Sequence, residues 1–228
     1  MGKGMWESVF QRSFDAMLFD MDGTILTSIK AAERVWAAWA IAHGLDPETF
    51  LPTIHGVQSV ETIRRLGLPG VDPEAEAAAI TRAEIADTGG IEAIAGAGAF
   101  LAALPARRWA VVTSAPRALA LRRIEASGLP LPPVLVTAED VPRSKPAPDC
   151  FLLGARRLGV AAERCLAFED SAAGIEAAES AGCTVVVVTA THRHPLPTRH
   201  GALPDYVRLR LLDEASGMRV SVVDAAPG

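Results

Sequence analysis

Short apolar runs that alternate with helical stretches are the feature that most limits how this chain can fold. The runs are rich in β-branched residues and show no polar alternation, which favours parallel strands covered on both faces. They occupy residues 12–20, 109–113, 134–137, 165–168 and 184–188. Helical periodicity fills residues 98–104, 116–127, 148–158 and 171–181. This order predicts an α/β fold with a doubly wound, mostly parallel Rossmann-like sheet, whose ligands bind beyond the carboxyl ends of the strands.

A long helical block interrupts this alternation after the first strand. Residues 29–91 contain no convincing strand, and their apolar residues follow helical spacing around 30–43, 60–66 and 73–87. We therefore expect an inserted α-helical cap domain at residues 29–91. Residues 12–28 and 92–228 would form the α/β catalytic core, after an N-terminal tail at residues 1–11. Residues 191–204 are rich in His, Pro and Arg and are expected to form a surface loop.

Composition excludes several classes of function. Half of the 228 residues are hydrophobic, the net charge is −5, and no basic cluster is interleaved with aromatic residues, so nucleic acid is not an expected partner. No apolar window reaches the ~18 residues of a membrane span, and the N-terminus lacks a secretory hydrophobic region. We expect a cytoplasmic protein with no membrane partner, either a monomer or a small homo-oligomer. Its three cysteines have no paired spacing and are expected to be reduced and buried.

Two carboxylates follow the first strand one residue apart. Asp20 and Asp22 stand in the segment Asp-Met-Asp-Gly-Thr, directly after an apolar run. Like charges at this spacing repel each other and raise each other's pKa unless a cation or a proton relieves them. A hard divalent metal ion held by oxygen ligands would do so. One carboxylate could then act as a nucleophile while the other moves protons.

Three further polar signals fall at the ends of later strands. They are Thr113-Ser114, Lys145 before a proline, and Glu169-Asp170. Lys145 is one of only three lysines among 22 basic residues. In a chain that otherwise uses arginine, this choice indicates a role for a compact ammonium group. Carboxylate pairs, hydroxyls and one ammonium suit a phosphoryl group and Mg²⁺. Asp20 and Asp170, with Glu169, are the expected metal ligands.

Together, these segments resemble the four ordered motifs of the haloacid dehalogenase-like phosphatases, a family that places a helical cap between its first and second motifs. The resemblance implies that Asp20 becomes an aspartyl phosphate and that Asp22 is the general acid and base. It implies catalytic roles for Thr113 and Lys145 as well, and a Mg²⁺ cofactor. The implied metal site consists of Asp20, Asp22, Asp170 and Glu169, and the implied phosphate site of Thr113, Ser114, Lys145 and Met21.

Within this family, residues 168–183 look most similar to the sugar and polyol phosphatases, among them the glycerol-phosphate and 2-deoxyglucose-6-phosphate phosphatases. Residues 109–114 and 136–141 point the same way. The resemblance implies a hydrolase acting on phosphoric monoesters. Its expected partner is a small phosphorylated metabolite, a sugar or polyol phosphate.

Other activities on this fold remain alternatives. A β-phosphoglucomutase-like mutase would have an Arg after Gly-Val-Ser in the cap and a His on the first cap helix, where this chain has Gln58-Ser59 and Ala32. A phosphonate-cleaving enzyme needs a cap lysine, and no lysine occurs between Lys30 and Lys145. A dehalogenase has no use for a second carboxylate or a magnesium site. A non-enzymatic binding protein on the same fold would be free to lose motif residues, and none is missing.

Several residues outside the motifs also bear on the site. His55 and Gln58 lie in a polar turn of the cap, and the resemblance implies that this turn faces the active site, so we expect both to contact the leaving group. Trp36 and Trp39 are three residues apart on one helix and are expected to pack internally. An exposed, Pro-rich loop accounts for His192, His194 and His200 better than a metal site does.

Overall fold

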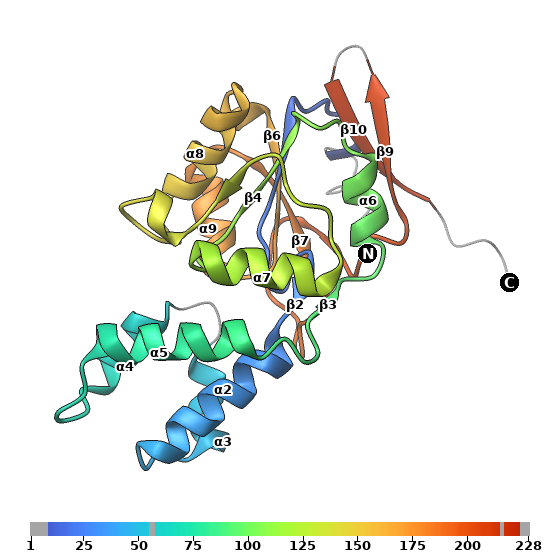
Figure 1. The fold of residues 1–228 in the computed structure, drawn as a ribbon. Helices are drawn as coiled ribbons and strands as arrows, with labels where there is room; N and C mark the ends of the chain where they lie inside the picture. The colour runs from blue at the N-terminus through green and yellow to red at the C-terminus, as the bar shows by residue number, and fades with distance from the viewer. Residues whose placement is uncertain (1–8, 55–57, 215–216, 224–228) are drawn as a thin grey trace, which may run out of the picture.

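The computed structural model describes residues 9–54, 58–214 and 217–223 and is built around a six-stranded parallel sheet with helices on both faces (Figure 1). The strand order is β5-β4-β1-β6-β7-β8. Every neighbouring pair in this sheet is parallel. The strands are β1 (Ala16–Phe19), β4 (Trp109–Val112), β5 (Leu135–Val136), β6 (Cys165–Glu169), β7 (Thr184–Val188) and β8 (Gly201–Leu203).

Alternate residues of the strands supply two separate hydrophobic cores. Met17 and Phe19 of β1 lie in the core that also contains residues of α6 (Ala97–Ala103) and α7 (Arg117–Ser127). Ala16 and Leu18 lie in the other, with residues of α8 (Asp149–Leu158) and α9 (Ala172–Ser180). Successive side chains of a strand point to opposite faces, so a strand buried on both faces is apolar throughout. The apolar runs therefore predicted the right kind of sheet.

The chain changes direction across the sheet beside β1. It runs from β1 to β4 and β5 on one side, then returns to β6, β7 and β8 on the other. The carboxyl ends of β1, β4 and β6 consequently lie next to one another at a topological switch point, where open α/β sheets bind their ligands. This arrangement confirms the predicted fold class.

Among the described residues, four α-helices and a 3-10 turn lie between β2 (Leu26–Thr27) and β3 (Glu92–Ala93), which pair antiparallel at the base of the insertion (Figure 1). Trp36, Trp39, Phe50, Ile63 and Ile80 form a hydrophobic core of their own, as expected for the two tryptophans. The exact cap boundary, residues 29–91, stays a prediction. The elements are α2 (Ile29–Ala42), α3 (Pro47–Phe50), η1 (Leu51–Thr53), α4 (Ser59–Leu66) and α5 (Pro73–Ala86).

Short polar and glycine signals set the ends of several helices. The Asp72 carboxylate accepts hydrogen bonds from the backbone N–H groups of Glu74 and Ala75 at the start of α5. Helices α7 and α8 end at Gly128 and Gly159, which adopt the left-handed conformation that favours glycine. The longest helices have 14 residues. In the part of the chain that the structure describes, no helix has the length and apolar character needed to cross a membrane.

Two local expectations were wrong. The first strand is shorter than residues 12–20. The expected surface loop at 191–204 includes β8, the sixth strand of the sheet, whose Leu203 is buried and accepts a hydrogen bond from Thr189 N–H at 2.7 Å. A run of Gly, Ala and Leu has no β-branched residue, so only pairing with β7 makes it a strand. Strands β9 (Leu209–Glu214) and β10 (Gly217–Val222) form an antiparallel pair beyond it.

Candidate active site

Lys145 joins three of the four polar segments. Its Nζ donates to Asp20 Oδ1 at 2.5 Å, to Glu169 Oε1 at 2.6 Å and to the backbone oxygen of Val112 at 3.2 Å. These partners stand at the carboxyl ends of β1, β6 and β4. The ammonium therefore lies at the switch point of the sheet and ties the three strand ends together.

Lys145 keeps its charge in this buried position. Only 6% of its side chain is exposed. Burial alone would lower its pKa, but the negative charges of Asp20 and Glu169 outweigh burial and raise the pKa above its ordinary value. The group is thus a permanent cation, also placed 5.3 Å from the centre of the Phe151 ring. It can bind an anion but cannot serve as a base.

Asp20, Glu169 and Asp170 form a cluster of carboxylates. One oxygen from each lies within 4.8 Å of the others. Burial raises the pKa of Asp20 to about 7, with Lys145 opposing this and the charge of Glu169 adding to it. Burial, reinforced by the charges of Asp20 and Glu169, also raises the pKa of Asp170. Three carboxylates that repel one another and offer only oxygen atoms suit a hard divalent cation.

The three members of this cluster are not equally available to a metal ion. Glu169 Oε1 faces Lys145, and its Oε2 accepts from the backbone N–H groups of Asp170 and Ser171 and from Ser171 Oγ. Among the described residues, no side chain donates a hydrogen bond to the Asp170 carboxylate. Asp20 and Asp170 are therefore better placed as direct ligands, while Glu169 orients Lys145 and the following turn.

Asp22 lies apart from this cluster. Ser28 Oγ donates to its Oδ1 at 2.6 Å, and Arg123 Nη1 donates to its Oδ2 at 2.9 Å. Sequence reasoning missed Arg123, which lies one helical turn from the buried Leu119 and Ala120 on the inward face of α7. An arginine at a core position of an amphipathic helix was the signal that could have revealed it.

The expected phosphate-binding residues surround Asp20. Thr113 is buried, and its Oγ1 accepts a hydrogen bond from Ala115 N–H at 3.1 Å. Thr24 Oγ1 donates to Asp20 Oδ2 at 3.2 Å, and Ser114 lines the cleft beside them. The Met21 side chain is fully buried in the core, so only its backbone is available to a ligand. Their assignment as a phosphate site stays a prediction.

A cleft of about 1090 Å³ opens between the core and the helical insertion. Asp20, Asp22, Thr113, Lys145 and Asp170 line its core side. The polar residues on the side of the insertion are Glu33, Glu48, Gln58, Ser59, Thr81 and Glu84. The contact expected between Gln58 and the leaving group stays a prediction, and His55 lies outside the described residues.

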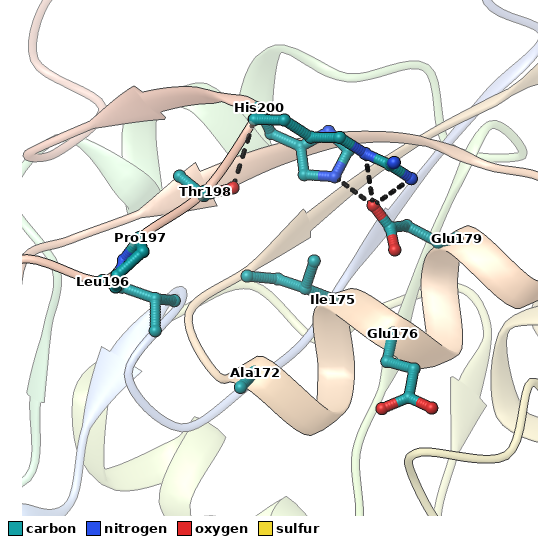
Figure 2. Close-up of a pocket in the computed structure, with 9 residues that line it drawn as sticks. Ala172, Ile175, Glu176, Glu179, Leu196, Pro197, Thr198 and His200 are labelled. Atoms are coloured by element: carbon teal, nitrogen blue, oxygen red, sulfur yellow. Dashed lines mark hydrogen bonds and ion pairs between the residues drawn. The ribbon is translucent and has the colours of Figure 1, made fainter.

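The histidine-rich segment is anchored rather than loose. His192 shares a 2.7 Å hydrogen bond with the backbone oxygen of Asp170 and, with the exposed His194, lines the cleft. Farther along, His200 Nε2 lies 2.5 Å from Glu179 Oε1 on α9. Figure 2 shows this pair at one end of a second, shallower pocket of about 520 Å³ beside α9. None of these histidines joins the carboxylate cluster found among the described residues.

The family model of the haloacid dehalogenase-like hydrolases matches residues 14–182. This span begins two residues before β1, ends in the turn after α9 and includes all four polar segments. The chain belongs to the haloacid dehalogenase-like hydrolases. The resemblance predicted from the four motifs is therefore confirmed.

The relatives of this haloacid dehalogenase-like hydrolase include proteins named as phosphatases. Hexitol phosphatase A of Escherichia coli is 44% identical over 180 residues, which cover 76% of this chain and 82% of that protein. Glycerol-1-phosphate phosphohydrolase 2 of Saccharomyces cerevisiae is 33% identical over 190 residues, which cover 78% of this chain and 75% of that protein. The expected hydrolase class, with phosphatases as its named relatives, is confirmed.

A solved structure supports the fold independently. CbbY from Rhodobacter sphaeroides, crystallised with phosphate, superposes with a TM-score of 0.73 at 24% identity. The match covers 85% of this haloacid dehalogenase-like hydrolase and 95% of CbbY. The likeness supports the α/β fold.

Proposed function

We propose that this protein is a Mg²⁺-dependent phosphatase that hydrolyses a small polyol or sugar phosphate through an aspartyl phosphate on Asp20. The observation that carries this proposal is the position of Asp20, whose carboxylate lies at the cleft with Lys145 on one side and Asp170 on the other. The named relatives, a hexitol phosphatase and a glycerol-1-phosphate phosphohydrolase, support the choice of substrate class.

The first chemical step transfers the phosphoryl group to Asp20. Lys145 donates to Oδ1 of this carboxylate at 2.5 Å, whereas among the described residues Oδ2 accepts only the longer bond from Thr24, so Oδ2 is the freer nucleophile. As its bond to phosphorus forms, the bond to the leaving oxygen breaks. Protonated Asp22 gives its proton to that oxygen, which leaves as an alcohol.

The second step restores the enzyme. Asp22, now a carboxylate, takes a proton from a water molecule that attacks the phosphorus, and the bond from phosphorus to Asp20 breaks. Inorganic phosphate is released and Asp22 is protonated again. The ammonium of Lys145 and the hydroxyl groups of Thr113 and Ser114 would balance the charge of the phosphate oxygens in both steps. A bound Mg²⁺, held by Asp20 and Asp170, would neutralise further negative charge.

The lining of the helical insertion suits a hydroxyl-rich leaving group. Glu48, Gln58 and Thr81 offer hydrogen-bond acceptors and donors to hydroxyl groups. Glu33 and Glu84 line the same side, where they pair with Arg193 and Arg123. We infer that residues 29–91 act as the cap that selects the substrate, with Gln58 among its contacts. The three free, buried cysteines support a reducing compartment such as the cytoplasm.

The test is phosphate release from a panel of hexitol, glycerol, sugar and nucleotide monophosphates, with Mg²⁺ and with a chelator. We expect turnover of polyol or sugar phosphates that needs Mg²⁺ and falls at least ~10³-fold in Asp20→Asn, because the nucleophile is lost. Circular dichroism would check that this variant is folded. No release from any monoester, or full activity of Asp20→Asn, would contradict the proposal. Conversion of β-glucose 1-phosphate to glucose 6-phosphate would favour the mutase alternative.

A further inference from the structure

Arg123 lies between two carboxylates that belong to different parts of the molecule. Its Nη1 donates to Asp22 Oδ2 at 2.9 Å, and its Nη2 lies 3.3 Å from Glu84 Oε1. Asp22 follows β1 in the core, Arg123 is on α7, and Glu84 is on α5 of the helical insertion. One guanidinium thus connects the expected general acid to the insertion.

Arg123 and Glu84 are buried, whereas Asp22 is partly exposed. Arg123 is 7% exposed and Glu84 is 5% exposed, whereas 30% of the Asp22 side chain faces the cleft. Burial raises the pKa of Glu84, and the charge of Arg123 opposes that shift. A buried carboxylate far from water needs such a partner.

The geometry is poor for stability alone. Arg123 Nε is buried without a hydrogen-bond partner among the described residues, and the contact with Glu84 is longer than that with Asp22. Buried ion pairs that leave a donor unsatisfied commonly stabilise a protein less than apolar packing would. The arrangement does, however, fix a carboxylate: Arg123 holds one oxygen of Asp22 and Ser28 holds the other.

We propose that Arg123 is a positioning residue for Asp22 and that Glu84 holds its guanidinium in place from the helical insertion. Asp22 would then keep the orientation needed at the leaving oxygen only while α5 stays packed on α7. This inference rests on the proposed function, in which Asp22 protonates the leaving group.

The test compares two leaving groups. An alkoxide, as in glycerol 1-phosphate, must be protonated when it leaves, whereas 2,4-dinitrophenolate is stable as an anion. The parameter kcat/KM isolates the steps up to phosphoryl transfer. For Arg123→Met we expect kcat/KM to fall ~10- to 100-fold on glycerol 1-phosphate and less than ~3-fold on 2,4-dinitrophenyl phosphate, because only the first reaction needs Asp22 as an acid. Arg123→Lys should recover part of the loss.

A double-mutant cycle shows whether Arg123 acts through Asp22. In the Asp22→Asn background, Arg123→Met should cause no further loss on glycerol 1-phosphate, since residues acting as one unit are not additive. The matched control is Arg122→Met, which removes an exposed neighbour on α7 that pairs with Glu125. It should leave both substrates unaffected.

Different outcomes separate the possible failures. Equal losses on both substrates, or additive losses in the cycle, would overturn the positioning role of Arg123. If Arg123→Met does not fold, Glu84→Gln provides the second measurement. Its kcat/KM should fall on the alkyl phosphate more than on the aryl phosphate, by a smaller factor than in Arg123→Met. Unchanged kinetics of Glu84→Gln would count against the proposal. If the wild-type protein releases phosphate from no monoester of the panel, the proposed function itself fails.

Discussion

At the scale of single residues, the absence of a side chain at Gly174 shapes the site as much as any charged group does. Gly174 lies in the first turn of α9, where its N–H donates to Ser171 Oγ at 3.1 Å. A Cβ at this position would overlap the carboxylate of Glu169. That carboxylate cannot move without losing its bonds to Lys145 and Ser171, so the close approach requires glycine.

Gly174→Ala should therefore damage both the site and the fold. We expect the free energy of unfolding to fall by ~1–3 kcal/mol, as for other overpacked sites, and phosphate release to fall at least ~10-fold because Lys145 loses a partner. Urea unfolding and phosphate release measure the two effects. Gly98→Ala on α6 is the matched control, since its Cβ would meet only Leu129 Cδ2 at 3.8 Å, and it should be neutral or slightly stabilising. Equal behaviour of the two variants would contradict this account of Gly174.

At the scale of elements, Asp140 connects the end of β5 to two helices. One of its oxygens accepts from the N–H and Oγ1 of Thr137, which closes a capping box at η2 (Ala138–Asp140). The guanidinium groups of Arg117 on α7 and Arg157 on α8 bind the same carboxylate at 2.6 and 2.7 Å. The hydrogen bond from Arg157 contributes most to lowering the pKa of Asp140.

The sign of this shift predicts a dependence on pH. A carboxylate whose pKa is lower in the folded state adds stability above its unfolded pKa, here 3.8, and loses it as the pH falls further. Asp140→Asn should destabilise the protein by ~2 kcal/mol at pH 7, the cost of a cap and charged hydrogen bonds. The difference from wild type should shrink below about pH 4. Urea unfolding at several pH values measures it, and a difference that stays constant down to pH 3 would show that the charge of Asp140 is irrelevant.

At the scale of the whole molecule, the cleft exists because the insertion and the sheet have separate hydrophobic cores and are joined by two short strands. The insertion packs around Trp36 and Trp39, the sheet has its own cores, and β2 and β3 link them. Asp20, Asp22 and Asp170 stand on the core side of the cleft, and polar insertion residues such as Gln58 stand opposite. Under the proposed function, this division would let the chemistry and the choice of leaving group reside in different parts of the chain.

Binding of Mg²⁺ should stabilise the whole protein, since the ion would offset repulsion within the carboxylate cluster. At a concentration of 100 times its dissociation constant, a ligand of the folded state adds ~2.7 kcal/mol, which should raise the Tm by several degrees. Differential scanning fluorimetry with Mg²⁺ and with a chelator measures this shift. Asp170→Asn should abolish it. Asp15→Asn, which removes an exposed carboxylate paired with Arg164, should retain it. A shift that survives in Asp170→Asn would place the metal ion elsewhere.

The sequence by itself determined the kind of sheet and which polar residues follow its strands. Apolar runs of this kind favour covered parallel strands, and the carboxyl ends of such strands meet, so the sequence predicts that Asp20, Lys145 and Asp170 lie close together. Local signals of this strength do not depend on distant partners. The same reasoning identified the helical insertion and the internal packing of its tryptophans.

Only the tertiary structure decided contacts whose local sequence carries no signal. Strand β8 is a strand because β7 offers it an edge, and a run of Gly, Ala and Leu does not reveal this. Arg123 meets Glu84 because α5 packs against α7. It meets Asp22, which is 101 positions away in the sequence, because α7 also packs beside β2. Side-chain pairing across such distances depends on how helices cross in space, and the positions of buried charges follow from that geometry alone.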